Sequence, residues 1–128
     1  MVPLHFVHHR SPREDAIPLL FIHGWPGSFL EVSNIIGNLT HPPNASVPAF
    51  HVVAPSIPGF GFLPAPQHPI FGPVEALHAL NELMGQLGYT KYVIQGGDLG
   101  GVIGVILRYQ AQLFPQRVVS ALSNFWII

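Results

Sequence analysis

The stretch Val93–Gly101 limits the possible folds of this chain more than any other part of its sequence. It begins with a short β-branched run, which predicts a buried strand, and leads into a long apolar run that predicts a helix. Between them, small residues flank a single acid in the pattern small-x-acid-x-small, centred on Asp98. Gly96 and Gly100 leave room for the backbone to pass itself closely at a sharp turn. We therefore expect a strand–turn–helix motif in which Asp98 has a strained backbone conformation.

Two roles are open for Asp98 at this turn. The layout is that of a nucleophile elbow, with Asp98 in the position that serine has in G-x-S-x-G. Its side chain would stand at a helix N-terminus, where free N–H groups and the helix dipole favour a carboxylate. Such a carboxylate is a nucleophile that needs no base to deprotonate it. The alternative is that Asp98 only caps the helix on a glycine-rich loop, and these residues alone favour neither role.

Strands and helices are expected to alternate along the chain. The predicted strands cover residues 4–9, 19–22, 50–54 and 92–94, and another begins at Val118. The predicted helices cover residues 28–39, 73–87 and 99–114, the last of them buried and ended by Pro115. We expect Ser28 and Glu31 to form a capping box, and Gly88 to end the second helix. This alternation indicates the α/β class, with a mostly parallel sheet and helices on both faces.

Three glycine-rich loops follow predicted strands, beginning near His23, Pro55 and Gly96. In α/β folds, active residues lie beyond the carboxyl ends of the parallel strands. All three loops would occupy such ends, so they would converge on one edge of the sheet. This convergence favours a functional site over three unrelated turns.

The composition limits the classes of function open to the chain. Its 128 residues suffice for one small domain, and its charged fraction of 9% is low for such a domain. A net charge of −1, with Lys91 as the sole lysine, argues against nucleic-acid binding. The absence of cysteine excludes disulfides and thiolate metal sites. A metal site at His5, His8 and His9 is disfavoured, because neighbouring strand residues face opposite sides and no carboxylate accompanies them.

Signals for a membrane or for secretion are not found in the sequence. No apolar run approaches the roughly 20 residues of a membrane span. The N-terminus lacks the basic-then-apolar order of a signal peptide. We therefore expect a cytoplasmic location, and the sequence indicates no particular oligomeric state.

The three loops carry a specific resemblance. Residues 23–28, 55–62 and 95–98 are similar, in order, spacing and sequence, to the microsomal-type epoxide hydrolases of the α/β-hydrolase family. The resemblance covers essentially the whole chain but only about the N-terminal half of that family's catalytic domain. It implies an α/β-hydrolase fold that stops before the cap and the last strands. It also implies hydrolysis of a small apolar epoxide to a vicinal diol, as in epoxide metabolism and detoxification, without a cofactor or metal.

The resemblance also implies roles for individual residues. Asp98 would be the nucleophile, and the backbone N–H groups of Trp25 and Leu99 would form the oxyanion hole. The Trp25–Pro26 bond would be cis. The motif residues with structural roles would be His23, Gly24, Pro26, Gly96, Gly97 and Gly100. The pocket wall would be shaped by Pro58, Gly59 and Phe60.

The chain departs from this family's pattern in two ways. Leu99 and Gly101 stand where the family commonly has tryptophan and serine, which changes the floor of the pocket. In addition, no histidine, aspartate or glutamate follows Asp98, and Tyr109 lies within a predicted helix. The histidine-activated water and the two cap tyrosines of the family mechanism are therefore missing. We expect residues 1–128 to form a partial hydrolase domain without turnover of its own.

Two other functions remain open alongside an epoxide hydrolase. Dehalogenases of the same fold share the aspartate at the elbow, but Trp25 and Leu99 replace their usual halide-binding donors. A non-catalytic fragment or remnant agrees with the missing histidine and acid. Activity on an oxirane and on a chloroalkane, measured with a full-length form, would separate the two enzyme classes.

Overall fold

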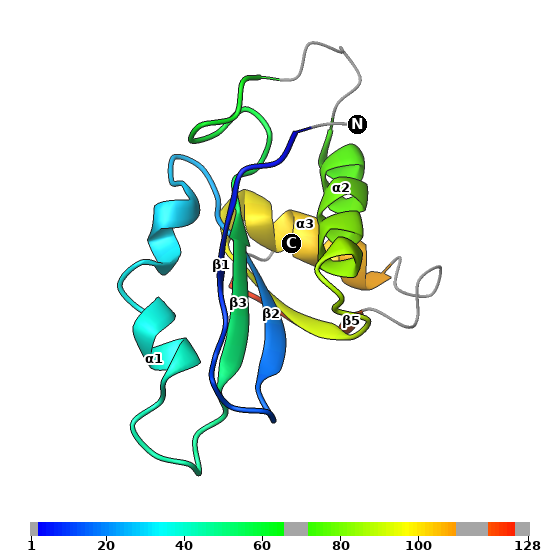
Figure 1. The fold of residues 1–128 in the computed structure, drawn as a ribbon. Coiled ribbons are helices and arrows are strands. Elements are labelled where there is room, and N and C mark those ends of the chain that lie inside the picture. The colour runs from blue at the N-terminus through cyan, green and yellow to red at the C-terminus, as the bar shows by residue number, and fades with distance from the viewer. Residues whose placement is uncertain (1–2, 66–71, 110–117, 125–128) are drawn as a thin grey trace.

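The computed structural model describes residues 3–65, 72–109 and 118–124 as one five-stranded sheet with helices against it (Figure 1). The strands are β1 (Phe6–His9), β2 (Ile17–Ile22), β3 (Phe50–Pro55), β4 (Tyr92–Gly96) and β5 (Val118–Ser123). The helices are a 3₁₀ turn, η1 (Phe29–Val32), and α1 (Ile36–Thr40), α2 (Pro73–Gln86) and α3 (Asp98–Tyr109). The α/β class and the alternation expected from the sequence are confirmed.

The order of strands in the sheet is β1-β3-β2-β4-β5. Only β1 runs antiparallel, pairing with β3, and the other neighbours are parallel. The chain passes from β2 to β3 on one side and later returns to β4 on the other side of β2. The loops after β2 and β4 therefore leave the sheet in opposite directions, which opens a crevice between their carboxyl ends. Within the described residues, β5 is an edge strand of the sheet.

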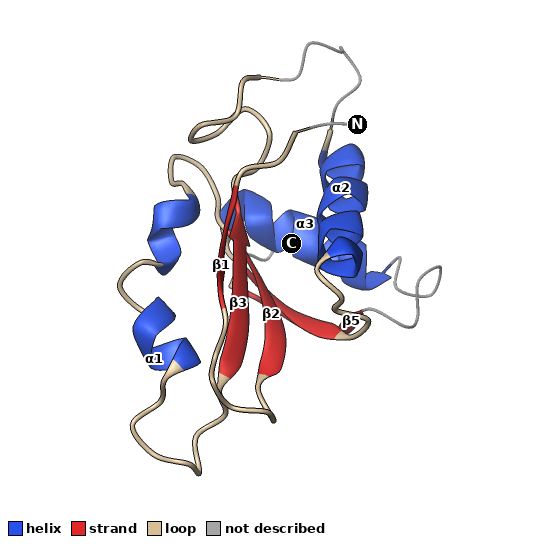
Figure 2. Ribbon diagram, in the orientation of Figure 1, coloured by secondary structure: helices blue, strands red, loops and turns tan. Residues whose placement is uncertain are grey.

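Helices cover both faces of the sheet, which is why its central strands are apolar in sequence (Figure 2). The larger core lies between the sheet and α2 and α3, where Leu20, Leu80 and Ile94 are almost completely buried. A smaller core on the other face includes Val32 and Val52 and lies next to η1 and α1. The sheet thus forms a rigid middle layer whose loops carry the site.

The helix predicted over residues 28–39 is wrong, because the structure divides it into η1 and α1. Ser28 does cap, since its side chain accepts a hydrogen bond from the Leu30 amide, but Glu31 does not complete a capping box. The Glu31 carboxylate instead lies over Gly27. Ser33 and the asparagine that follows it separate the two pieces, and such side chains compete with the helical backbone for hydrogen bonds.

The helix predicted over residues 99–114 begins where expected, as α3, but the prediction that it is buried is wrong. Val105 and Tyr109 of α3 are 46% and 81% exposed. The side of α3 that bears Ile103 and Leu107 packs in the core, so the helix is buried on one side and exposed at Val105 and Tyr109. The predicted end at residues 114–115 lies outside the described residues.

The helix predicted over residues 73–87 is confirmed as α2. Pro73 is its first residue, and Gly88 follows its end with φ of +85°, a conformation that suits glycine. Val74, in the first turn of the helix, is 40% exposed. Within the described residues, no helix is long and apolar enough to cross a membrane.

Candidate functional site

The three glycine-rich loops meet at one edge of the sheet, as the sequence predicted. The first follows β2 at His23, the second follows β3 at Ser56, and the third joins β4 to α3 at Gly97. Because β2, β3 and β4 are parallel neighbours, their carboxyl ends lie together. The site therefore occupies the crevice where the chain changes direction across the sheet.

Asp98 has the strained backbone that the elbow pattern predicts. Its φ of +50° is the one positive value found at a described residue other than glycine. A side chain in this region of φ and ψ is uncommon and is retained where the surrounding structure holds it. Asp98 is also the first residue of α3, so its side chain stands at the N-terminus of that helix.

Close backbone contacts explain the glycines on either side of Asp98. A Cβ atom on Gly96 would lie 2.3 Å from the carbonyl oxygen of Gly100. A Cβ atom on Gly100 would lie 2.1 Å from the carbonyl oxygen of Ile22 and 2.4 Å from that of His23. Backbone atoms cannot give way as a side chain can, so α3 approaches β2 this closely only through glycine.

The Asp98 carboxylate lies where two backbone amides can hold an anion. The Trp25 amide donates to its Oδ2 atom over 2.8 Å. The amides of Trp25 and Leu99 together hold the pKa of the Asp98 carboxyl below its ordinary value, against a smaller opposing effect of burial. Trp25 and Leu99 are the two residues whose amides the sequence resemblance assigned to the oxyanion hole. The carboxylate is thus kept ionised and oriented.

The loop after β2 is shaped to bring the Trp25 amide to the carboxylate. The Trp25–Pro26 peptide bond is cis, as the resemblance implied. Gly24 lies directly against Asp98, since a Cβ atom there would be 2.6 Å from the Asp98 Cβ atom. The Trp25 side chain itself is 72% exposed, so its contact with Asp98 is made by the backbone.

His23 is completely buried and joins two of the loops. Its Nε2 accepts a hydrogen bond from the Ile57 amide over 3.0 Å, and its Nδ1 lies 3.1 Å from the Gly24 carbonyl oxygen. These partners assign the neutral form with the proton on Nδ1, which donates to Gly24. The ring also packs edge-on against Phe60 at 5.3 Å between centroids. His23 therefore holds the loop after β2 against the loop after β3.

The loop after β3 forms one wall of a small cavity beside α3. Pro58 and Phe60, both expected in the pocket wall, line this cavity of about 140 Å³, whereas Gly59 does not. Gly59 has φ of +93° and serves the turn of the loop. The described residues that line it are Ile57, Pro58, Phe60, Gly72, Pro73, Ala76, Leu99 and Ile103.

Several residues at this edge were not anticipated from the sequence. Ala76 and Ile103 line the cavity, but in the sequence they appear only as apolar positions of helices. Asn124, just after β5, has its side-chain oxygen 2.6 Å from where a Cβ atom on Gly97 would stand. One signal in the sequence could have indicated Asn124. It follows a predicted strand, and the carboxyl ends of parallel strands lie at the same edge of a sheet.

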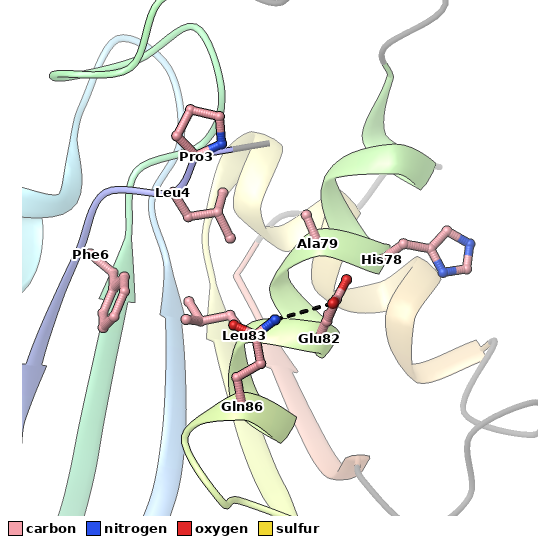
Figure 3. Close-up of a pocket in the computed structure, with 8 residues that line it drawn as sticks. All are labelled: Pro3, Leu4, Phe6, His78, Ala79, Glu82, Leu83 and Gln86. Carbon is pink, nitrogen blue, oxygen red and sulfur yellow. Dashed lines mark hydrogen bonds between the residues drawn. The ribbon is translucent and has the colours of Figure 1, made fainter. Parts of the chain in front are cut away.

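A larger groove lies apart from these residues, between the segment that leads into β1 and helix α2 (Figure 3). Its volume is about 750 Å³. Glu82 and Gln86, joined by a hydrogen bond of 3.1 Å, stand on its α2 side, and Leu4 and Phe6 stand on the other. None of the residues expected in the site lines this groove, so its size alone does not make it the chemical centre.

No group of metal-binding side chains is present in the described parts of the chain. His8 instead lies 2.8 Å from the Tyr89 hydroxyl, and His5 lies 2.9 Å from the Ser56 hydroxyl. These histidines come from the same strand region but have separate partners.

Comparison with protein families gives two matches. Residues 1–32 match the family described as the epoxide hydrolase N terminus, and residues 17–123 match the alpha/beta hydrolase fold. The second match includes β2 to β5 and all three glycine-rich loops. The resemblance and the fold inferred from the sequence are therefore confirmed.

Individual proteins that are similar to this chain are also epoxide hydrolases by name. The chain is 41% identical to a putative epoxide hydrolase of Stigmatella aurantiaca and 40% identical to epoxide hydrolase 1 of Sus scrofa. Each comparison covers 98% of this chain and 28% of the relative. Among solved structures, juvenile hormone epoxide hydrolase of Bombyx mori has a TM-score of 0.83 at 35% identity, covering 95% of this chain and 32% of that one. The chain thus spans less than a third of these relatives.

Proposed function

Because this chain belongs to the α/β-hydrolase fold family and is similar to epoxide hydrolases along nearly all of its length, we propose that it carries the nucleophile of an epoxide hydrolase. The observation that supports this most is the Asp98 carboxylate, ionised and held 2.8 Å from the Trp25 amide. The substrate is a small apolar epoxide, and the reaction uses no cofactor.

The first step forms an ester on Asp98. One carboxylate oxygen attacks a carbon of the oxirane ring, and the bond between that carbon and the ring oxygen breaks. The ring oxygen takes up one proton from solvent water, which leaves hydroxide, and becomes the hydroxyl of a hydroxyalkyl ester. Hydrogen bonds from Trp25 and Leu99 favour this step by keeping the carboxylate ionised and in one orientation.

The second step hydrolyses the ester. Water adds to the carbonyl carbon of the Asp98 ester, and the negative charge gathers on the former carbonyl oxygen. The amides of Trp25 and Leu99 donate to that oxygen, as an oxyanion hole does. Collapse of the tetrahedral intermediate releases the vicinal diol and restores the carboxylate, which now contains the oxygen from water.

The two steps make different demands on the chain. Ester formation needs the nucleophile, whereas fast ester hydrolysis needs a base to activate water. No histidine, aspartate or glutamate follows Asp98, and His23 is occupied by two hydrogen-bond partners. We therefore propose that residues 1–128 supply the nucleophile and the oxyanion hole, and that this chain alone forms the ester without turnover.

Covalent labelling of Asp98 tests the proposal directly. The purified protein is treated with 1,2-epoxyhexane, and its intact mass and peptide map are then measured. We expect a mass increase of one epoxide, located on Asp98, that Asp98→Asn abolishes. Asp15→Asn is the matched control, because Asp15 is an exposed carboxylate paired with Arg13 and far along the chain from the site. It should leave the Asp98 label in place.

Three further outcomes would contradict the proposal or one part of it. If 1-chlorohexane labels Asp98 with release of chloride while the epoxide does not, the chain is a dehalogenase. If neither reagent labels Asp98 in the folded protein, the carboxylate is only a helix cap. Continuous diol formation by this chain would contradict the absence of turnover but not the role of Asp98.

A further inference from the structure

His5, just before β1, lies at the same edge of the sheet as Asp98, although the two residues are far apart in the chain. Because β1 runs antiparallel to β3, with Phe6 opposite Pro55, the start of β1 lies beside the carboxyl end of β3. The Ser56 amide donates to the His5 carbonyl oxygen over 2.8 Å, which extends this pairing by one residue. The backbone therefore brings His5 to the loops that form the site.

The side chain of His5 contacts residues next to two of these loops. Its Nδ1 atom lies 2.9 Å from the hydroxyl oxygen of Ser56, at the start of the loop after β3. Its ring packs edge-on against Phe62, further along that loop, at 5.0 Å between centroids. It also packs edge-on, at 4.6 Å, against Phe29, which begins η1 directly after the loop that follows β2. One side chain thus connects the loops after β2 and β3.

The hydrogen bond between His5 and Ser56 holds a buried group. Ser56 is completely buried, and the loop folds back over its hydroxyl, because a Cβ atom on Gly61 would lie 3.0 Å from its Oγ atom. A buried hydroxyl that loses its hydrogen-bond partner is costly, since it has also lost its hydrogen bonds to water. The Nδ1 atom of His5 therefore fixes the start of the loop after β3.

Hydrogen bonds lead from this loop to the reacting carboxylate. His23 accepts from the Ile57 amide over 3.0 Å and donates to the Gly24 carbonyl oxygen over 3.1 Å. That carbonyl and the Trp25 amide belong to one planar peptide unit. The Trp25 amide donates to the Asp98 Oδ2 atom over 2.8 Å. A shift of the loop after β3 is therefore transmitted to the amide that orients the carboxylate.

We propose, on the basis of the function proposed above, that His5 is a positioning residue for the reaction at Asp98. It acts through Ser56 and His23 on the Trp25 amide, not by contact with the epoxide. A His5 variant without the Nδ1 atom keeps the backbone pairing of β1 with β3, so it should fold. It should nevertheless weaken the hydrogen bond that the carboxylate receives.

The test replaces the ring of His5 by one of similar shape without nitrogen, in His5→Phe. The pKa of the Asp98 carboxyl is measured by NMR titration of its carboxyl carbon, and the labelling rate is measured with 1,2-epoxyhexane. The pKa should rise toward its ordinary value, because the Trp25 amide favours the ionised form. Labelling should slow about fivefold to tenfold, the factor for one hydrogen bond. His5→Asn, whose amide nitrogen takes the place of Nδ1, should reverse both changes.

The matched control is His8→Phe. It removes a similar hydrogen bond, because His8 lies 2.8 Å from the Tyr89 hydroxyl, but it does so at the opposite end of the sheet. It should leave the pKa of Asp98 and the labelling rate unchanged. If it alters them as much as His5→Phe does, the effect is a general one and the inference is wrong.

A double variant separates positioning from stability. His5→Phe combined with Ser56→Ala removes both partners, so no buried hydroxyl is left unpaired and the stability lost in His5→Phe should return. Labelling should remain slow, because the connection to the loop is still absent. If the labelling rate recovers together with stability, His5 has a structural role only.

The remaining outcomes distinguish this inference from the proposed function. If His5→Phe changes neither the pKa of Asp98 nor its labelling rate, His5 does not position the site. If the epoxide labels none of the proteins but the pKa rises in His5→Phe, the proposed function is wrong and the positioning by His5 stands. Should His5→Phe fail to fold, Ser56→Ala removes the same hydrogen bond from its other end and decides the question by the same two measurements.

Discussion

At the scale of single residues, Gly24 limits the space around the Asp98 carboxylate. A Cβ atom there would lie 2.6 Å from the Cβ atom and 2.8 Å from the Oδ2 atom of Asp98. Gly24→Ala should therefore push the carboxylate away from the Trp25 amide. A displacement of about 1 Å can reduce a reaction rate about a hundredfold, so labelling of Asp98 should fall by about that factor. The rate is measured by mass spectrometry under the conditions used for the unmodified protein.

The control for this variant is Gly37→Ala. A Cβ atom on Gly37 would meet no other atom within 4 Å, so the same chemical change is made in open space. Labelling by Gly37→Ala should match that of the unmodified protein. Undiminished labelling of a folded Gly24→Ala protein would show that the carboxylate reacts from another position.

The glycines around Asp98 could be predicted because the need for small residues at this turn arises from neighbours in the sequence. A strained turn between a strand and a helix requires small neighbours, and Gly96 and Gly100 are visible as such in the sequence. The contact between the Trp25 amide and Asp98 spans 73 residues, and only the family resemblance indicated it. Ala76 could not be predicted at all, because an alanine that lines a cavity and one that fills a core have the same pattern in sequence.

At the scale of elements, the contact of α3 with β2 depends on Gly100. A Cβ atom there would lie 2.1 Å from the Ile22 carbonyl oxygen, which is fixed in the sheet. We expect Gly100→Ala to lower the free energy of unfolding by about 3 kcal/mol, because overpacking against backbone forces the two elements apart. Urea unfolding followed by circular dichroism measures this change.

Gly104, one turn further along α3, provides the comparison within the same helix. The nearest atom to a Cβ there is a methyl group of Ile94 at 3.1 Å, which can shift slightly. The better helix propensity of alanine, worth up to about 1 kcal/mol, opposes this crowding. Gly104→Ala should thus change stability by less than about 1 kcal/mol. Equal losses for both variants would mean that the close contact at Gly100 is not the reason.

The elements that could be predicted are those whose hydrophobic pattern fits only one type of secondary structure. The apolar runs of β2, β3 and β4 and the spaced apolar residues of α2 fit buried strands and an amphipathic helix. The segment over residues 28–39 also has helical spacing, yet Ser33 interrupts it. Its Val32 is buried and Ile35 is 42% exposed, so packing against β3 decides the result and not periodicity alone. Such tertiary preferences are not visible in a single sequence.

At the scale of the whole molecule, the ends of the sheet have different chemistry. The carboxyl ends of the parallel strands carry Asp98, whereas the opposite end carries a cluster of His8, His51 and Tyr89. His8 lies 2.8 Å from the Tyr89 hydroxyl, and the rings of His51 and Tyr89 are stacked at 5.9 Å. This cluster joins β1, β3 and the connection between α2 and β4. It therefore links elements that are far apart in the chain.

Both histidines of the cluster favour the neutral form in the folded protein. Burial lowers the pKa of His8, and the charges of Arg10 and His51 lower it further. Burial and Arg10 lower the pKa of His51, whose Nδ1 also accepts a hydrogen bond from the Ser11 amide over 3.1 Å. That hydrogen bond requires an unprotonated Nδ1. Protonation of either ring thus works against the fold.

The cluster predicts that the protein loses stability as the pH falls. In the unfolded chain both histidines titrate near pH 6.5, whereas in the folded protein they bind protons only at lower pH. Below pH 6.5 the unfolded state therefore binds more protons, and the free energy of unfolding decreases until the folded pKa values are reached. We expect the urea midpoint to decrease from pH 7.5 to pH 5.5. The decrease should be smaller in His51→Asn, which keeps an acceptor for the Ser11 amide but does not titrate.

The control is Gly37→Ala, which changes no titrating group. Any change that it makes in the urea midpoint should be the same at both pH values. If His51→Asn has the same pH dependence as the unmodified protein, the loss arises elsewhere in the molecule.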